Sequence, residues 1–450
     1  MTIRQFEDKN LSHYSYAILS NGEIALVDPA RDPQPYYDFA KSHNAKIVAV
    51  FETHPHADFI SSHLEIHNTT GAAIYISKLV EADYPHTPLN DNDEIEIGDG
   101  VMKALLTAGH SPDSLSYLLL DDNQEQAVFT GDTLFVGDCG RPDLREQAGA
   151  VMATRDSLAR HMYHSLREKL MTLPDSTIVY PAHGAGSLCG KGLSEQNSST
   201  IGAEKISNWS LQKMTEDEFV KALLTDQPFI PKYFPNSVGI NKRGAKLFRE
   251  SVDRIDIKPY NNQSLDNGLI IDTRKQTEFR KGHLKGAINL MDDTRFETWL
   301  GSIVNPNETF YLIGASEAQL QKLIERTARI GYESQLAGAF IADTFTQENE
   351  PSFDANQLKQ KPDAFTILDI RNPSEVALTK PFEHSINIPL YELRERVGEI
   401  PAGKPIVVHC AGGYRSAAGA SIVKAKMNSN SQAVYDLSDD IKQFNLQLTS

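Results

Sequence analysis

The chain has 450 residues, of which 40% are hydrophobic and 23% are charged, and these values are typical of globular proteins with buried cores. At about 150 residues per domain, this length predicts two to four domains. The formal net charge of −16 leaves no basic region for nucleic acid, and no apolar stretch reaches the roughly 20 residues that a membrane span requires. We therefore expect no nucleic-acid partner and no membrane span.

The first ten residues, MTIRQFEDKN, lack the basic start and apolar middle of a secretory signal, so we expect an unexported, cytoplasmic protein. Three cysteines, Cys139, Cys189 and Cys410, are too few for a disulfide framework and fit a reducing compartment. Eleven of the 14 histidines lie at or before His183. A metal site is therefore expected in that part of the chain.

The N-terminal region begins with a predicted hairpin. In YAILSNGEIALVD, two apolar runs flank Asn21 and Gly22, residues that tolerate positive φ in a tight turn. An amphipathic stretch at 36–43 predicts a helix, and AKIVAVF at 45–51 predicts a strand buried on both faces. Antiparallel strands followed by an α/β arrangement are therefore expected.

Potential metal ligands follow four predicted strands. AKIVAVF precedes THPHAD, and the apolar runs VMKALLTAGH, AVFTGD and TIVYPAH each end on a histidine or an aspartate. Loops at strand ends converge on a rigid sheet edge, so four such endings favour a metal centre over unrelated surface histidines. The candidates are His54, His56, Asp58, His110, Asp132 and His183.

Other histidines of this region lack such a pattern. His63 and His67 lie on a predicted helix, but the glutamate between them is misplaced for the zinc pattern H-E-x-x-H. We expect both of them, with His161 and His164, on helix surfaces.

The motifs THPHADF, GHSPDS, FTGDTLFVGDCGRPD and YPAHG, in this order, resemble the metallo-β-lactamase fold and, within it, the glyoxalase II-like and persulfide dioxygenase branch. The resemblance implies an αββα sandwich with a metal at one edge of two facing sheets. The dinuclear hydrolases of this fold carry His-x-His-x-Asp-His, whereas Phe59 replaces the last histidine here. A single metal ion is therefore expected.

The resemblance to the persulfide dioxygenases implies one Fe(II) per chain, held by His54, His110 and Asp132. Two imidazoles and one carboxylate leave positions open on a non-haem iron, although zinc and manganese accept the same ligands. His56, Asp58 and His183 are then expected to surround the ligands, where they orient them or carry protons.

Two further residues near this site have alternative interpretations. Arg141, in GDCGRPDL, suits a substrate carboxylate, or forms a salt bridge that holds its loop. Cys189, in HGAGSLCGKG, lies in a mobile glycine-rich segment where Lys191 would favour the thiolate. It either carries a persulfide between sites, as the resemblance to fused proteins suggests, or is a buried thiol.

The C-terminal half contains a repeat. LIIDTRKQTEFRKGHLKGAINL at 269–290 aligns with TILDIRNPSEVALTKPFEHSINIPL at 366–390. The shared pattern resembles the rhodanese domain, which implies two small parallel-sheet α/β domains. We expect domains at 1–245, 255–350 and 358–450.

Only the second copy has a nucleophile. In IVVHCAGGYRSA, Cys410 follows a strand and precedes a loop that opens a helix, an arrangement whose backbone N–H groups bind anions and stabilise a thiolate. The spacing matches the sulfurtransferase loop, with Arg415 as a catalytic residue and Gly412, Gly413 and Ser416 binding substrate. The first copy aligns Gly314 with the cysteine, so it is expected to be structural.

Together, these resemblances imply a sulfide-detoxifying fusion. The metal domain would convert a low-molecular-weight persulfide and O₂ to sulfite and thiol, and Cys410 would form or use thiosulfate by covalent sulfur transfer. The family also implies a homo-oligomer. Two alternatives remain: a zinc-dependent thioester hydrolase of glyoxalase II type, and a sulfur carrier or sensor with a vestigial metal site.

Overall fold

The computed structural model describes most of the chain, namely residues 1–121, 124–145, 153–265, 267–342, 347–350, 353–427 and 432–445. It divides into two compact units, Met1–Ser251 with Ala328–Gly331 and Val252–Thr327 with Tyr332–Ser450. The first unit contains the predicted metal ligands and the second contains both copies of the repeat. Within the described residues, no helix is long and apolar enough to cross a membrane.

The first sheet of the first unit has its six strands in chain order: β1 (Thr2–Asp8), β2 (His13–Ser20), β3 (Glu23–Val27), β4 (Lys46–Phe51), β5 (Ala73–Ser77) and β6 (Thr87–Leu89). The predicted hairpin is confirmed, because β2 and β3 pair antiparallel across Asn21 and Gly22, which both have positive φ. Helix α1 (Gln34–Ser42) then returns the chain, so that β4 pairs with β3 in parallel.

The second sheet has the order β12-β11-β10-β9-β8-β7. Its strands are β7 (Glu94–Ile97), β8 (Gly100–Leu106), β9 (Leu115–Asp121), β10 (Gln124–Gly131), β11 (Ile178–Pro181) and β12 (Ser199–Thr200). Most neighbours are antiparallel, but β10 and β11 are parallel. This parallel pair delivers Asp132 and His183 to the same edge of the sheet.

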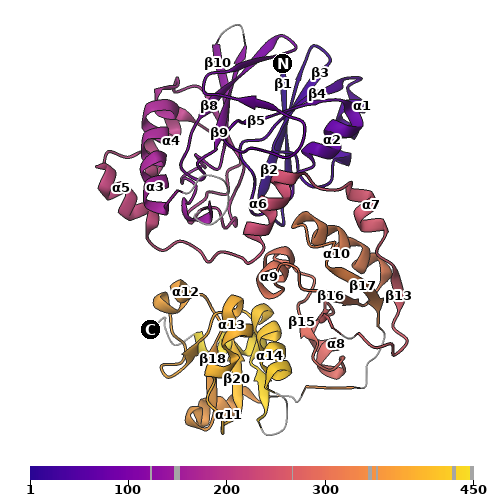
Figure 1. Ribbon diagram of the computed structural model, residues 1–450. Helices are drawn as coiled ribbons and strands as arrows, with labels where there is room; N and C mark the ends of the chain where they lie inside the picture. Colours follow the sequence, from indigo (N-terminus) through magenta and orange to yellow (C-terminus); the bar gives the residue numbers. More distant parts are fainter. Residues whose placement is uncertain are drawn as a thin grey trace. The chain divides into compact units, whose positions relative to one another are not determined.

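The two sheets face each other across a shared core. Tyr16 and Phe51 of the first sheet pack in one cluster with Tyr117 and Phe129 of the second. Helices α1 and α2 (His63–Thr70) cover the outer face of the first sheet, and α3 (Arg155–His164) and α5 (Glu216–Leu224) cover that of the second, as Figure 1 shows. The predicted αββα sandwich is therefore confirmed.

The first unit also contains short helical segments around the second sheet and near its C-terminal end. These are η1 (Asp143–Arg145), η2 (Ser165–Lys169), η3 (Leu170–Thr172), α4 (Ile201–Ser207), η4 (Trp209–Leu211) and α6 (Phe234–Arg243). Helix α7 (Phe248–Asp253) begins in the first unit and ends in the second.

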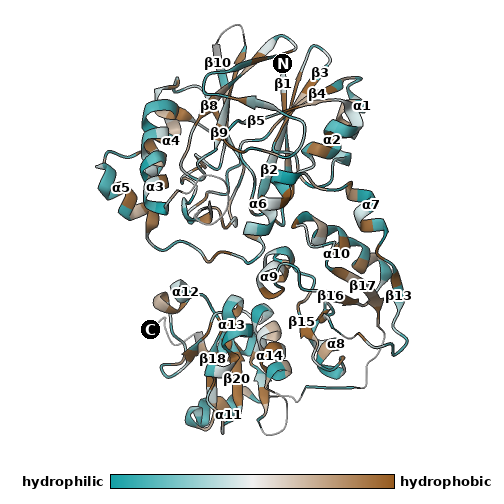
Figure 2. Ribbon diagram, viewed as in Figure 1, coloured by the Kyte–Doolittle hydropathy of each residue, from teal (hydrophilic) through white to brown (hydrophobic). Residues whose placement is uncertain are grey.

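The second unit has two parallel sheets, one for each copy of the repeat. The first has the order β13-β17-β16-β14-β15, with β13 (Ile257–Pro259), β14 (Leu269–Asp272), β15 (Ile288–Asn289), β16 (Phe310–Gly314) and β17 (Leu336–Ile341). The second has the order β19-β18-β20-β21, with β18 (Thr366–Asp369), β19 (Ile386–Asn387), β20 (Ile406–His409) and β21 (Val434–Asp436). The central strands β16, β18 and β20 are coloured as hydrophobic in Figure 2, as expected for strands covered on both faces.

Helices and short turns connect these strands. In the first copy they are α8 (Gln276–Lys281), α9 (Phe296–Ile303) and α10 (Glu317–Arg329). In the second copy they are α11 (Ala355–Gln360), η5 (Pro362–Ala364), α12 (Pro373–Leu378), α13 (Leu390–Arg396), η6 (Val397–Glu399), α14 (Tyr414–Lys426), η7 (Ser438–Ile441) and α15 (Lys442–Asn445). The predicted small α/β folds are confirmed, while the exact domain boundaries stay a prediction.

Both copies contain the same buried Asp-x-Arg ion pair. In the first, Arg274 donates from Nη2 to Oδ2 of Asp272 at 2.7 Å, and in the second, Arg371 donates to Asp369 in the same way at 2.6 Å. In each copy, an asparagine on the next strand donates to the backbone carbonyls of both members of the ion pair. This residue is Asn289 in the first copy and Asn387 in the second. The repeated motif therefore fixes the turn after the first central strand of each copy.

Candidate functional site

Three of the predicted ligands meet in the first unit. His54 follows β4, His110 follows β8 and Asp132 follows β10, and one ligand atom of each lies within 4.8 Å of the other two. All three side chains are buried. Oδ2 of Asp132 lies 3.5 Å from Nε2 of His110 and 3.9 Å from Nε2 of His54.

This geometry fits a metal ion. Distances of 3.5 and 3.9 Å are longer than a good hydrogen bond. They suit ligands that each lie about 2 Å from one shared ion, because such ligands are then roughly 3–4 Å apart. Two imidazoles and one carboxylate form a donor set for a divalent transition metal. The structure therefore brings together the three residues that the sequence singled out as ligands.

A residue that the sequence analysis missed orients the first ligand. Both carboxylate oxygens of Asp28 accept hydrogen bonds from Thr53, from its backbone N–H at 2.7 Å and from its hydroxyl at 2.8 Å. The same hydroxyl oxygen lies 3.0 Å from Nδ1 of His54. Asp28 directly follows β3, so the rule that ligands gather at strand ends applies to it as well.

His56 lies beside two buried carboxylates, those of Asp28 and Glu52. Its Nε2 lies 3.0 Å from Asp28 and 3.8 Å from Glu52, and all three residues are buried. Burial alone lowers the pKa of His56, but Asp28, Glu52 and Asp58 outweigh it and raise this pKa to about 9. His56 is therefore a cationic partner of these carboxylates.

His63 is buried, which makes the expectation of a helix-surface residue wrong. Its Nδ1 lies 3.6 Å from Glu52, and its ring contacts Tyr84 at 4.5 Å. His63 is the first residue of α2, directly after the ligand loop. Its contact with Glu52 therefore buries it, although the sequence pattern of the helix predicts a surface position. His161 and His164 are exposed, as expected.

Phe59 is buried beside the ligand loop and packs against a histidine that the sequence analysis did not consider. The rings of Phe59 and His13 are 3.8 Å apart, and His13 also lies 5.7 Å from the ring of His183. Burial and the neighbouring histidines lower the pKa of His13 well below its usual value, so its ring is neutral. Phe59 therefore occupies an apolar, ring-packed position.

Cys189 is buried beside Asp58 and His183, and one ligand atom of each lies within 4.8 Å of the others. Burial, together with Asp132 and Asp58, raises the pKa of its thiol well above the usual value. The expectation that Lys191 favours the thiolate is wrong, because Lys191 donates to backbone carbonyls at 222 and 225. The role of Cys189 as a sulfur carrier stays a prediction.

Arg141 is buried and holds its own loop together. Its guanidinium group forms a bidentate pair with Asp143, at 2.6 and 2.7 Å, and donates to the carbonyl of Leu188 at 3.2 Å. Its backbone N–H donates to the carbonyl of Cys189 at 2.9 Å. These contacts correspond to the salt-bridge alternative, and they tie the GDCGRPD segment to the loop of Cys189.

The glycine that precedes Arg141, Gly140, lies too close to the metal ligands to carry a side chain. A Cβ atom at this position would overlap the carbonyl oxygen of Asp132 and lie 3.1 Å from Nδ1 of His110. Only a residue without a side chain lets the loop approach two of the three ligands so closely.

In the second unit, Cys410 directly follows β20 and is buried. The backbone N–H of Gly413 donates to its Sγ at 3.1 Å, and the hydroxyl of Ser416 donates to the carbonyl of Gly413 at 3.0 Å. Gly412 is exposed and a Cβ there would meet no atom within 4 Å. The loop therefore curls around the sulfur and remains open at its tip.

Arg415, the predicted catalytic arginine, is paired with an acidic residue. Both of its terminal nitrogens donate to Glu375 at the start of α12, at 2.6 and 2.7 Å. The first copy also reaches this loop: Arg415 lies over the ring of Trp299 at 5.8 Å, and the hydroxyl of Tyr414 donates to the carbonyl of Met291 at 3.2 Å. The first copy therefore contacts both residues that follow the glycines of the loop.

The first copy has no thiol at the corresponding position. Gly314 ends β16, and a Cβ atom there would lie 2.7 Å from Cγ of Leu320 and 3.2 Å from Oε1 of Gln319. The space that the thiol of Cys410 occupies in one copy is filled by side chains of α10 in the other.

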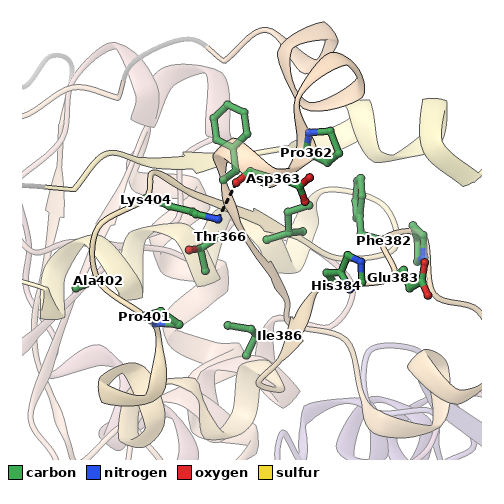
Figure 3. Close-up of a pocket in the computed structure, with 13 residues that line it drawn as sticks. Pro362, Asp363, Thr366, Phe382, Glu383, His384, Ile386, Pro401, Ala402 and Lys404 are labelled. Carbon is green, nitrogen blue, oxygen red and sulfur yellow. Dashed lines mark hydrogen bonds between the residues drawn. The ribbon is translucent and has the colours of Figure 1, made fainter.

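A pocket of about 530 Å³ lies in the second copy but away from the nucleophile. Figure 3 shows that its walls include Thr366, Ile386 and Lys404, which lie at or before the amino ends of β18, β19 and β20. Cys410 follows the carboxyl end of β20. We therefore assign this pocket no part in sulfur transfer.

Comparison with known proteins agrees with both units. Residues 9–183 match the Metallo-beta-lactamase superfamily, and residues 258–338 and 354–447 match the Rhodanese-like domain. The mitochondrial persulfide dioxygenase ETHE1 of Bos taurus is 30% identical over 51% of this chain and 82% of its own length. The chain belongs to the persulfide dioxygenase and rhodanese fusions of the metallo-β-lactamase superfamily.

Other members of this superfamily are also similar. A metallo-beta-lactamase from Staphylococcus aureus subsp. aureus COL, known from its crystal structure, is 32% identical, with a TM-score of 0.68 over 76% of this chain and 99% of its own. The cytoplasmic hydroxyacylglutathione hydrolase of Arabidopsis thaliana is 32% identical over 38% of this chain and 63% of its own length. The fusion thus has relatives on both the oxidative and the hydrolytic side of the superfamily.

Proposed function

We propose that this fusion oxidises a low-molecular-weight persulfide with O₂ and transfers sulfane sulfur through Cys410. The observation that carries the proposal is the buried set of His54, His110 and Asp132, with Phe59 at the position where the dinuclear hydrolases have a ligand. The similarity of this chain to a persulfide dioxygenase, over 82% of the length of that protein, supports the same assignment.

His54, His110 and Asp132 would hold one Fe(II) per chain. When bound, this ion supplies the redox chemistry that O₂ activation requires, with positions left open by a two-histidine, one-carboxylate set. The chain keeps the set in place through Thr53 and through the close approach of Gly140. All three ligands are buried, so access of bulk water to the ion would be limited.

The overall oxidation converts RSSH, O₂ and water to RSH, sulfite and two protons. The outer sulfur is oxidised, the S–S bond breaks and O₂ is reduced. The released protons have acceptors nearby, because Oδ2 of Asp58 and Nε2 of His183 lie 3.3 Å apart next to Asp132. Both side chains are buried, so they would accept these protons within the site.

Sulfur transfer would use Cys410 as a nucleophile. Its thiolate attacks a sulfane sulfur and becomes a persulfide, while the donor leaves as a thiol or as sulfite. The N–H of Gly413 stabilises the charge on Sγ. The persulfide on Cys410 then passes to sulfite and gives thiosulfate, or the same steps run in reverse.

Oxygen uptake tests the proposal. The protein is loaded anaerobically with Fe(II) and mixed with glutathione persulfide, and O₂ consumption and sulfite are followed together. We expect equal amounts of O₂ consumed and sulfite formed, and His110→Ala should abolish both. The absence of uptake by iron-loaded protein, with this persulfide and with those of coenzyme A and a bacillithiol-like thiol, would overturn the proposal.

A thioester hydrolase is the second candidate, since the chain is also similar to a hydroxyacylglutathione hydrolase. Hydrolysis would require a metal-bound water and a glutathione thioester as substrate. The apolar contact of Phe59 with His13 argues against a second ion of the dinuclear type. Release of free thiol from such a thioester by zinc-loaded protein, without oxygen uptake by iron-loaded protein, would favour this candidate.

A further inference from the structure

The turn that follows β21 lies directly against the loop of Cys410. A Cβ added to Gly413, whose φ is +96°, would lie 3.1 Å from the backbone nitrogen of Asp439 and 3.2 Å from the carbonyl carbon of Ser438. Gly413 in turn donates its backbone N–H to Sγ of Cys410 at 3.1 Å. The position of this turn therefore limits where the N–H donor to the sulfur can lie.

Ser438 has a backbone conformation that needs support from its surroundings. Its φ of +51° is in the left-handed region, which is unfavourable for a residue with a Cβ, and such strain persists where neighbouring contacts hold it. Its N–H donates to Oδ1 of Asp436 at 2.8 Å, and its hydroxyl donates to Oε1 of Gln276 at 2.7 Å. The first contact is local to the turn, whereas Gln276 begins α8 in the first copy of the repeat.

Gln276 contacts the turn with both ends of its amide. A carboxylate only accepts, so Nε2 of Gln276 donates to Oδ2 of Asp436 and its Oε1 is left to accept from the hydroxyl of Ser438. Arg280, one helical turn further along α8, donates to the backbone carbonyl and to Oδ2 of Asp436, at 3.0 and 3.2 Å. Two side chains of the first copy therefore hold the turn that backs Gly413.

We propose that Gln276 of the first copy is a positioning residue for the nucleophile of the second copy and acts through Ser438 and Gly413. This inference rests on the proposed sulfur transfer through Cys410. Gln276 holds the strained turn, the turn supports Gly413, and Gly413 directs its N–H at the sulfur, where it stabilises the thiolate. Loss of the amide contact would let the turn relax and would weaken that hydrogen bond. The copy without a thiol thus contributes to the reactivity of the other one.

Alkylation of Cys410 by iodoacetamide tests this role in the full chain, because the reagent reacts with the thiolate and requires no sulfur transfer. The rate at a fixed pH is followed by mass spectrometry of the peptide that contains Cys410, so the other two thiols do not interfere. Gln276→Met keeps the length of the side chain and removes both amide contacts. The matched control is Thr277→Ala, at an exposed position of the same helix.

We expect Gln276→Met to slow the alkylation about three- to tenfold, as one weakened hydrogen bond to a charged sulfur would, and Thr277→Ala to leave the rate unchanged. Ser438→Ala, which removes the other partner, should also slow it. The double variant should be no slower than Gln276→Met alone, because the two substitutions remove the same contact. General loosening of the fold would instead expose Cys410 and make alkylation faster, so the direction of the change separates positioning from lost stability.

Three results would overturn the proposal: an equal or faster rate in Gln276→Met, additive effects in the double variant, or a Cys410 that resists alkylation in the natural chain. Sulfur transfer that persists in Cys410→Ser would count against the proposed function and would leave these alkylation rates unaffected. The two failures can therefore be told apart.

Discussion

The hydroxyl oxygen of Thr53 lies 3.0 Å from Nδ1 of His54. Thr53 has one hydroxyl hydrogen, and it is directed to the carboxylate of Asp28 at 2.8 Å. The oxygen of Thr53 can therefore only accept from His54, which places the imidazole proton on Nδ1. Nε2 of His54, the nitrogen nearest to Asp132, is left with the lone pair that a metal needs.

Replacement of this hydroxyl is expected to weaken metal binding. Thr53→Val preserves shape but removes the acceptor for Nδ1 of His54, and loss of such an orienting contact lowers metal affinity about 10- to 100-fold. Thr53→Ser keeps the hydroxyl and should retain most of the affinity. Competition with a calibrated chelator measures the dissociation constant of each variant. Equal affinities of the valine and serine variants would contradict this orienting role.

A methyl group at position 140 is expected to displace the ligands. In Gly140→Ala the new Cβ would overlap the carbonyl of Asp132, so the loop must shift, at an expense of about 1–3 kcal/mol of folding stability. We expect a lower melting temperature and loss of most of the bound metal. Gly398→Ala is the matched control, since a Cβ there meets no atom within 4 Å. A Gly140→Ala protein with normal metal content would show that the loop can shift without displacing the ligands.

The sulfur-transfer activity is expected to depend on one thiol. Cys410→Ser should reduce transfer from thiosulfate to cyanide by about a thousandfold or more, because the hydroxyl cannot form the persulfide. Cys139→Ser should retain the activity, since this buried thiol belongs to the first unit. Cyanide-dependent thiocyanate formation measures both variants. Substantial turnover by Cys410→Ser would point to a different sulfur acceptor.

Asp436 is expected to make the stability of the second unit depend on pH. This residue ends β21, where Arg280 of the first copy donates to its Oδ2 at 3.2 Å, and burial raises its pKa to about 6. A folded pKa above the unfolded value means that the contribution to stability is complete below about pH 4 and is lost as the pH rises through about 6. The loss amounts to about 3 kcal/mol at most.

Asp436→Asn removes this titration while keeping an acceptor for Arg280. Melting temperatures of the full chain between about pH 4 and pH 8 should therefore fall less steeply in the variant than in the natural protein. Burial and the neighbouring Asp436 raise the pKa of Glu350 to about 7, so Asp436→Asn should also lower the pKa of Glu350 and flatten the curve further. Parallel curves for the two proteins would exclude Asp436 as the source.

The metal ligands could be predicted because each follows a strand, and strand order determines where strand ends meet. His54, His110 and Asp132 were among the six candidates that this rule indicated, and the resemblance to the persulfide dioxygenases selected them from the six. Asp28 obeys it too, at the end of β3, but a single aspartate after a strand carries no motif and was passed over. Glu52 directly follows β4 and obeys the rule in the same way. His13 could not be found from local pattern, because its contacts with Phe59 and His183 join segments far apart in the sequence.

The state of Cys189 could not be predicted for a similar reason. Four glycines around it favour a mobile backbone, yet the loop is held by a hydrogen bond from the N–H of Arg141 to the carbonyl of Cys189 and is packed against the ligand loops. Composition describes what a segment is able to do when isolated. Which of those states it adopts depends on neighbours that only the folded chain supplies.

The contact between Gly314 and Leu320 has a consequence for placing a nucleophile in the first copy. A cysteine at position 314 would bring its Cβ to 2.7 Å from Cγ of Leu320, so this leucine would have to move or be replaced by a smaller residue. A single Gly314→Cys substitution therefore strains the packing against α10, and a functional graft needs a second change at Leu320.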